Sequence, residues 1–273
     1  MNFLQRCTGQ ATLIALCLAA ASGAYAQVSS INSVVINQRV FNDIPSSTDL
    51  YYNNYPSEIL LTELGVSAPT GYANRDVWYF ANTGGAYQFQ NNDYFDASFN
   101  VTLSGGSGTY YPEAGFLFSD PSGSFGGDAQ SLVKTDGEVV QFGGISYFGF
   151  SPANGGTSVP NYAQGETYTL GLDYVKDPNT GMNAFRYSVN GVFATSSPGD
   201  TYFDFAPGQG IGNVSGNELG GYFQIPNNPS NPGNSGQAVF TSISIVSVPE
   251  PSTLAFLGLG LGSVALVLRR RRI

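Results

Sequence analysis

The side chains that most often carry catalysis are scarce in this sequence. The 273 residues include no histidine, and the two cysteines are Cys7 and Cys17, close to the start of the chain. Without histidine, neither a Ser-His-Asp nor a Cys-His nucleophile can be assembled. Imidazole and thiolate are also the common ligands of zinc and copper, so we expect no site for either metal.

Carboxylates remain as candidates for acid–base chemistry. A glycosidase needs two of them about 5–10 Å apart across a cleft. Glu113, Glu166 and Asp173 stand singly in the sequence, and the Asp136–Glu138 pair includes a turn residue. We therefore predict no catalytic residue and no enzyme activity, with a glycoside hydrolase as the least favoured alternative.

A calcium ion needs only oxygen ligands, which the loops can supply. Asp173, Asp177 and Asn179 lie around one loop of the sequence and form a possible calcium site. Asp and Asn in loops usually serve turns instead, and the late bidentate Glu of an EF-hand is missing. No other cofactor is expected.

Aromatic side chains offer a different kind of binding site, because sugar rings stack on aromatic faces. Trp78, Tyr79, Tyr87 and Tyr94 cluster in the sequence and are possible glycan-stacking residues. In a strand, Trp78 and Phe80 would share the core face while Tyr79 pointed outward. The alternative is that these rings pack in the core or against neighbouring strands.

The elements that must position these residues are strands. Glycine is abundant, only 11% of residues are charged, and aromatic and β-branched runs alternate with turn formers. Phe95 to Leu103 alternates apolar and polar residues, which indicates a half-buried strand, and Asn190-Gly191 suits a type I′ hairpin turn. The segment 59–64 fits either a strand or one helical turn. The other expected strands span 34–41, 77–80, 86–89, 114–118, 131–133, 139–142, 145–150, 167–175, 184–189, 192–195 and 238–246. We predict an all-β, two-sheet antiparallel sandwich that is jelly-roll-like.

The hairpin from Gly165 to Ser196 supports the jelly-roll expectation. Its strand places Tyr168, Leu170, Leu172 and Tyr174 on one face and is followed by the turn at Asn190-Gly191. This pattern resembles the late hairpins of concanavalin-like or laminin-G-like jelly rolls. The resemblance implies a two-sheet antiparallel sandwich.

The N-terminal segment has the features of a secretory signal peptide. Arg6 precedes an apolar run from Ala11 to Ala21, and Ala24-Tyr25-Ala26 forms an A-x-A cleavage site. Cleavage would leave Gln27 as the first residue and would remove both cysteines. We therefore expect residues 1–26 to be a signal peptide and residues 27–247 to be the exported domain.

The C-terminal segment combines three features in a fixed order. Pro249, Glu250 and Pro251 lie within 248–252, the uncharged stretch 253–268 follows, and 269–273 carries a basic cluster. Sixteen residues at 1.5 Å each cover about 24 Å, enough for a short transmembrane helix. The cluster predicts that this end stays cytoplasmic. Its members are Arg269, Arg270, Arg271 and Arg272.

This order resembles a PEP-CTERM sorting signal over residues 248–273. The resemblance implies that an exosortase, a membrane-embedded cysteine peptidase, processes the tail. It also implies a membrane anchor before processing, and then a place at the cell surface or in the extracellular matrix of a biofilm. We expect an exported, non-enzymatic, structural or adhesive protein. The alternative is a lectin-like module that binds extracellular polysaccharide.

The charge balance excludes one class of partner. Between residues 27 and 248 the chain has 18 acidic residues and five basic ones. A surface of this sign repels phosphate backbones, so nucleic acid is not an expected partner.

Overall fold

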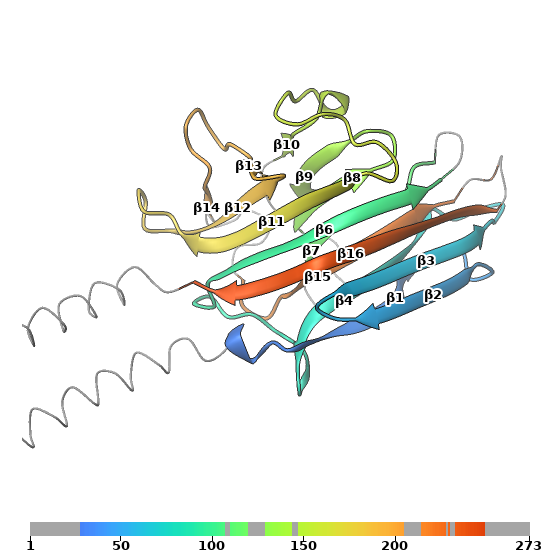
Figure 1. Cartoon of the computed structure of the whole chain (residues 1–273), viewed down its shortest axis with the longest axis horizontal. Helices are drawn as coiled ribbons and strands as arrows, with labels where there is room; N and C mark the ends of the chain where they lie inside the picture. The colour runs from blue at the N-terminus through green and yellow to red at the C-terminus, as the bar shows by residue number, and fades with distance from the viewer. Residues whose placement is uncertain are drawn as a thin grey trace, which may run out of the picture.

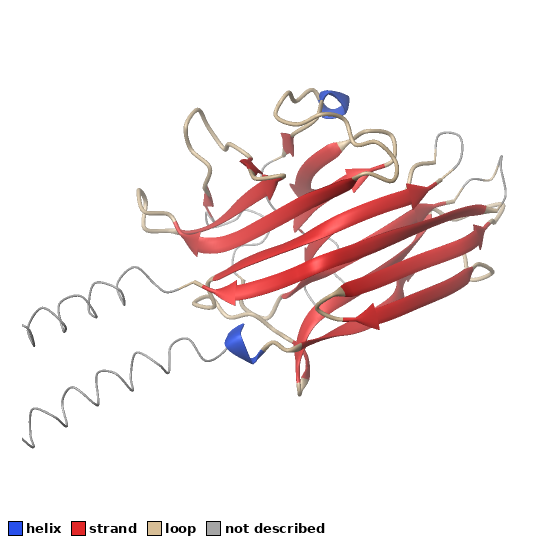
Figure 2. Cartoon of the chain, in the orientation of Figure 1, coloured by secondary structure: helices blue, strands red, loops and turns tan. Residues whose placement is uncertain are grey.

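The computed structural model describes residues 28–106, 110–119, 129–143, 147–204, 214–227, 229 and 233–248. The regular secondary structure of this part of the chain is almost entirely strands joined by loops, with two single-turn 3-10 helices, η1 (Val28–Ser30) and η2 (Pro152–Asn154) (Figures 1 and 2). Every strand pair is antiparallel, and the strands form two sheets. The predicted all-β, two-sheet antiparallel architecture is confirmed.

We call the two sheets sheet I and sheet II. Sheet I has the order β1 (Ser33–Asn42), β4 (Ala73–Asn82), β15 (Glu218–Pro226), β7 (Glu113–Ser119), β8 (Ala129–Lys134), β9 (Val139–Gly143) and β10 (Phe148–Gly149), with β5 (Gly85–Ala86) paired to β4. Sheet II has the order β13 (Val192–Phe193), β12 (Asn183–Val189), β11 (Thr167–Lys176), β6 (Phe95–Gly105), β16 (Asn234–Ser247), β3 (Glu58–Val66) and β2 (Thr48–Asn54), with β14 (Phe203–Asp204) paired to β12.

The core lies between the two sheets and is rich in aromatic rings. In β6 the odd-numbered residues from Phe95 to Leu103 are buried, as the alternation predicted. The ring centre of Trp78, in sheet I, lies 5.6 Å from that of Phe99 and 5.7 Å from that of Phe240. Both phenylalanines belong to sheet II, and both contacts are edge-to-face. Such pairs add to the burial of apolar surface in joining the sheets.

Turn chemistry also follows the sequence. Asn190 and Gly191 both have positive φ, 51° and 78°, which is the type I′ geometry that joins β12 to β13. Gly137, with φ of 105°, closes the turn between β8 and β9 by donating its N–H to the Lys134 carbonyl. These two hairpins confirm the predicted turns.

The structure differs from the predicted strands at a few places. The strand expected at 86–89 is reduced to β5, because Gln88 makes only an isolated bridge to Glu218. The segment 59–64 is part of the strand β3 and not a helical turn. The sequence did not predict β2, the short β14 or the central strand β15.

Candidate functional site

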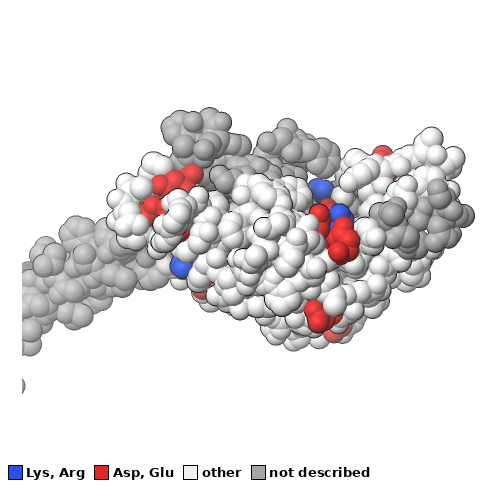
Figure 3. Space-filling model, turned by 90° about the horizontal axis from the view of Figure 1, so that it is seen from above, with Lys and Arg blue, Asp and Glu red and all other residues white. Residues whose placement is uncertain are grey.

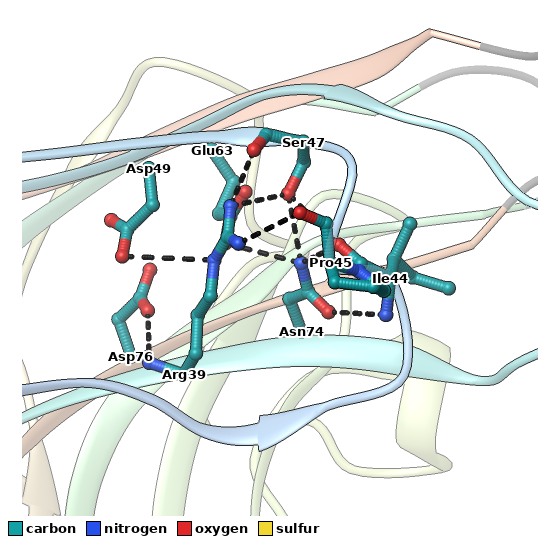
Figure 4. Close-up of polar contacts among 8 residues, drawn as sticks. All are labelled: Arg39, Ile44, Pro45, Ser47, Asp49, Glu63, Asn74 and Asp76. Atoms are coloured by element: carbon teal, nitrogen blue, oxygen red, sulfur yellow. Dashed lines mark hydrogen bonds and ion pairs between the residues drawn. The ribbon is translucent and has the colours of Figure 1, made fainter.

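An arginine of β1 gathers three carboxylates at the edge where the two sheets meet. Arg39 has a positive φ of 54° and lies where the pairing of β1 with β4 shifts register. Its backbone N–H donates to Asp76 Oδ1 (2.8 Å), and its Nε donates to Glu63 Oε1 (3.2 Å). Nε also lies 3.8 Å from Asp49 Oδ2. We call Arg39, Asp49, Glu63 and Asp76 the carboxylate cluster (Figure 4).

The two terminal nitrogens of Arg39 form hydrogen bonds with the loop between β1 and β2. Nη2 of Arg39 donates to the Ser47 carbonyl (2.6 Å) and to Ser47 Oγ (2.8 Å), and Nη1 donates to the Pro45 carbonyl (3.2 Å). Asn74 of β4 supports the same loop by bonding both the N–H and the carbonyl of Ile44, each at 3.0 Å. The position of the loop and that of the guanidinium are therefore fixed together.

Each carboxylate of the cluster gives one oxygen to Arg39 and keeps the other without a partner. Among the described residues, the buried atoms Asp49 Oδ1, Glu63 Oε2 and Asp76 Oδ2 have no hydrogen-bond partner. Glu63 and Asp76 are fully buried, at 0% exposure. One carboxylate oxygen from each of the three residues lies within 4.8 Å of the others. These residues could hold a cation with oxygen ligands.

The carboxylate cluster places three acidic side chains around a single arginine. Burial, together with the nearby Asp49 and Glu63 carboxylates, raises the pKa of Asp76 to about 7. The N–H and the charge of Arg39 act in the opposite direction. One guanidinium therefore compensates only part of the charge of the three carboxylates.

A second polar network lies on sheet I. Glu113 Oε1 accepts hydrogen bonds from Gln224 Nε2 (2.9 Å) and Tyr222 OH (3.3 Å), and Arg75 Nε donates to Gln224 Oε1 (2.8 Å). Burial raises the pKa of Glu113, while Arg75 lowers it. Arg75 also lies 5.2 Å from the centre of the Tyr222 ring. The network ties β4, β15 and β7 together.

The four aromatic residues predicted for glycan stacking are all buried. Trp78 is 0% exposed, Tyr94 3%, and Tyr79 and Tyr87 7% each. Tyr79 does lie on the face opposite Trp78, but its hydroxyl bonds Ser119 Oγ (3.0 Å), while Tyr87 OH donates to Asp93 (2.8 Å). The exposed ring face that stacking requires is therefore absent in these four residues.

The three residues of the possible calcium loop do not converge. Asp173 Oδ2 accepts from Arg186 (3.2 Å) on the neighbouring strand. Asp177 uses Oδ1 to accept the Asn179 N–H (2.7 Å) and Oδ2 to accept Thr180 Oγ1 (3.1 Å), which closes the loop. Both oxygens of Asp177 thus serve the turn, as Asp in a loop commonly does.

Several exposed apolar side chains belong to the strands that form the edge of the sandwich with the carboxylate cluster, or to the loop before β4. We define the edge patch as Val40, Leu50, Tyr51, Tyr52, Leu64 and Tyr72, whose exposed fractions lie between 41% and 64%. Three of these belong to β2, which pairs only with β3 and so ends sheet II (Figure 1). An exposed apolar edge strand of this kind commonly marks a contact surface.

The predicted sorting residues lie outside the part of the chain that the structure describes. These are the cleavage residues Ala24, Ala26 and Gln27, the triplet Pro249, Glu250 and Pro251, the stretch 253–268, and Arg269 to Arg272. Within the described ranges, no helix is long and apolar enough to cross a membrane.

The segment that follows the last strand matches a known family. Residues 247–272 match the family described as the PEP-CTERM protein-sorting motif. The chain carries a PEP-CTERM sorting motif. The motif begins at Ser247, the residue at which β16 ends, and it indicates an exported protein. No significant match was found among curated proteins.

Solved structures with a related arrangement of strands include concanavalin-like jelly rolls, which the hairpin at Gly165–Ser196 predicted. Alginate lyase A1-II′ is 13% identical, with a TM-score of 0.43 over 74% of this chain and 84% of that one. Alginate lyase AlgAT5 of polysaccharide lyase family 7 is 7% identical, with a TM-score of 0.44 over 72% and 82%. The Emp46p carbohydrate recognition domain is 11% identical, with a TM-score of 0.36 over 71% and 87%.

Proposed function

We propose that this chain is an exosortase-processed protein of the cell surface or extracellular matrix, with a structural or adhesive and non-enzymatic role. The observation that carries the proposal is the PEP-CTERM motif at 247–272, joined directly to the last strand of the sandwich. With so short a connection, the sandwich is held close to the membrane until the tail is processed.

The non-enzymatic part of the proposal rests on side-chain chemistry. The chain has no histidine, and both cysteines precede the predicted cleavage site. The Glu113 carboxylate on sheet I is engaged by Tyr222 and Gln224. If the protein cleaved a polysaccharide and Glu113→Gln abolished that activity, the result would contradict a non-enzymatic role and favour an enzyme.

Processing of the tail is tested by the C-terminus of the mature protein. Intact-mass spectrometry of protein from the producing bacterium is expected to show chains that lack Arg269 to Arg272. Replacing Pro249, Glu250 and Pro251 together by alanine should leave the arginines in place, while Thr253→Ala should not. Mature wild-type protein that retains all four arginines would contradict processing.

The adhesive role is supported by the edge patch. Leu50, Tyr51 and Tyr52 are about half exposed on an edge strand. On the opposite side of the molecule, which Figure 3 shows, charged side chains form only a few small groups. Aromatic rings and a free strand edge can contact a glycan or another protein. A lectin-like role is the second candidate, because these tyrosines have the exposure that stacking needs.

Replacing Tyr51 and Tyr52 by serine tests the edge patch. We expect at least a tenfold loss of binding to the producer's extracellular polysaccharide or of retention at the cell surface, with stability changed by less than about 0.5 kcal/mol. Tyr147→Ser, at a position 62% exposed elsewhere, is the matched control. Loss of glycan binding favours the lectin role, and loss of retention alone favours the structural role. Unchanged behaviour in both assays would rule out this patch as the contact surface.

A further inference from the structure

We propose that the carboxylate cluster binds one calcium ion, which joins β2 and β3 of sheet II to β4 of sheet I. Asp49 lies on β2, Glu63 on β3 and Asp76 on β4, so a shared ion would link the two sheets at their common edge. This goes beyond the proposed function, which requires no metal.

The spacing of the oxygens fits a calcium ion. Calcium binds oxygen at about 2.3–2.6 Å, so two oxygens on opposite sides of the ion lie about 4.6–5.2 Å apart and adjacent ones lie closer. In the cluster, one oxygen from each of the three carboxylates lies within 4.8 Å of the others (Figure 4). This mutual spacing is compatible with three carboxylates that share one ion.

The unpartnered oxygens are an independent indication of a ligand. Buried polar atoms almost always have a partner, and a buried charge without one is costly. Here Glu63 Oε2 and Asp76 Oδ2 are fully buried and have no hydrogen-bond partner among the described residues, and the same holds for Asp49 Oδ1. Arg39 already occupies the other oxygen of each carboxylate. A divalent cation would neutralise the two negative charges that Arg39 leaves.

The ligand chemistry selects calcium over other metals. All three ligands are carboxylates, which suit hard cations, and no histidine is available for zinc or copper. Magnesium prefers strict octahedral geometry and keeps several waters, which a buried site with three carboxylates does not favour. Asp49 is the least buried of the three residues, so the remaining positions on the ion can be filled by water from its side.

The test uses the full exported chain, purified in mild detergent and stripped with a chelator. Equilibrium dialysis with calcium chloride should show one calcium ion bound per chain. The Tm should rise by roughly 5–10 °C at a calcium concentration about 100 times the Kd. Binding that is absent at millimolar calcium would overturn the proposal.

Asp76→Asn separates a metal ligand from a merely structural carboxylate. Asn keeps an oxygen for the Arg39 N–H but removes a charged ligand. We expect calcium affinity to fall at least tenfold, while the Tm in chelator equals or exceeds that of the wild type. Asp49→Asn should also weaken binding, and it serves if Asp76→Asn does not fold.

Asp173→Asn is the matched control, because Asp173 belongs to the other loop considered for calcium. Its calcium affinity should equal that of the wild type. Loss of calcium binding in Asp173→Asn with full binding in Asp76→Asn and Asp49→Asn would overturn the assignment to the carboxylate cluster.

Discussion

Replacing Trp78 by alanine is expected to lower the free energy of unfolding by about 3–5 kcal/mol. The indole is fully buried and makes edge-to-face contacts with Phe99 and Phe240 of the opposite sheet and with Phe80 of its own strand. Its removal leaves a cavity between the sheets as well as losing these contacts. Urea unfolding followed by circular dichroism measures the loss, since the variant has no tryptophan for fluorescence.

Tyr72→Ala is the control for this measurement. Tyr72 is 64% exposed, so its truncation should change the free energy of unfolding by less than about 0.5 kcal/mol. Trp78→Phe should fall between the two, because it keeps an aromatic ring but not the full volume. A loss below about 1 kcal/mol for Trp78→Ala would mean that the two sheets do not pack through this residue.

Strands whose apolar residues recur at every second position could be predicted from the sequence. The central strand β15, which contains two glycines, could not. In β6 from Phe95 to Leu103 and in β11 from Tyr168 to Tyr174, every second residue is apolar and buried, and both strands lie where the sequence placed them. The central strand β15 carries Gly220, Gly221 and Pro226, which favour a turn on local grounds. The reason for these glycines is tertiary: a Cβ on Gly221 would lie 2.5 Å from Trp78 Nε1, and one on Gly220 would meet the Trp78 carbonyl.

The carboxylate cluster gave a weaker sequence signal than the loop at Asp173. Asp49, Glu63 and Asp76 are far apart in the chain and are brought together by the pairing of β2 with β3 and the packing of β3 against β4. One local sign was present. Asp76 lies two residues before Trp78, and Glu63 two residues after Leu61, so both occupy core-facing positions of their strands. A charged residue at such a position needs a buried partner.

Replacing Arg39 by methionine is expected to lower the free energy of unfolding by about 3–5 kcal/mol in the presence of a chelator at pH 8. Methionine keeps the apolar stem and the backbone N–H bond to Asp76, but it removes the only cation that contacts the carboxylates in the described structure, so their buried charges lose their counter-ion. The bonds to Ser47 and Pro45 are lost as well, so the loop before β2 should also loosen. The positive φ is present in both proteins and does not contribute to the difference. Urea unfolding measures the change.

Lys134→Met provides the comparison for Arg39→Met. Lys134 pairs with Asp136 (2.9 Å) and Glu138 (3.1 Å) in a turn where all three side chains are more than one-fifth exposed. Water screens such pairs, so we expect a loss of less than about 1 kcal/mol. Adding Glu63→Gln to Arg39→Met should recover part of the larger loss, because it removes one buried charge that no longer has a partner. Equal losses for Arg39→Met and Lys134→Met would mean that the cluster is solvated and that its carboxylates need no counter-ion.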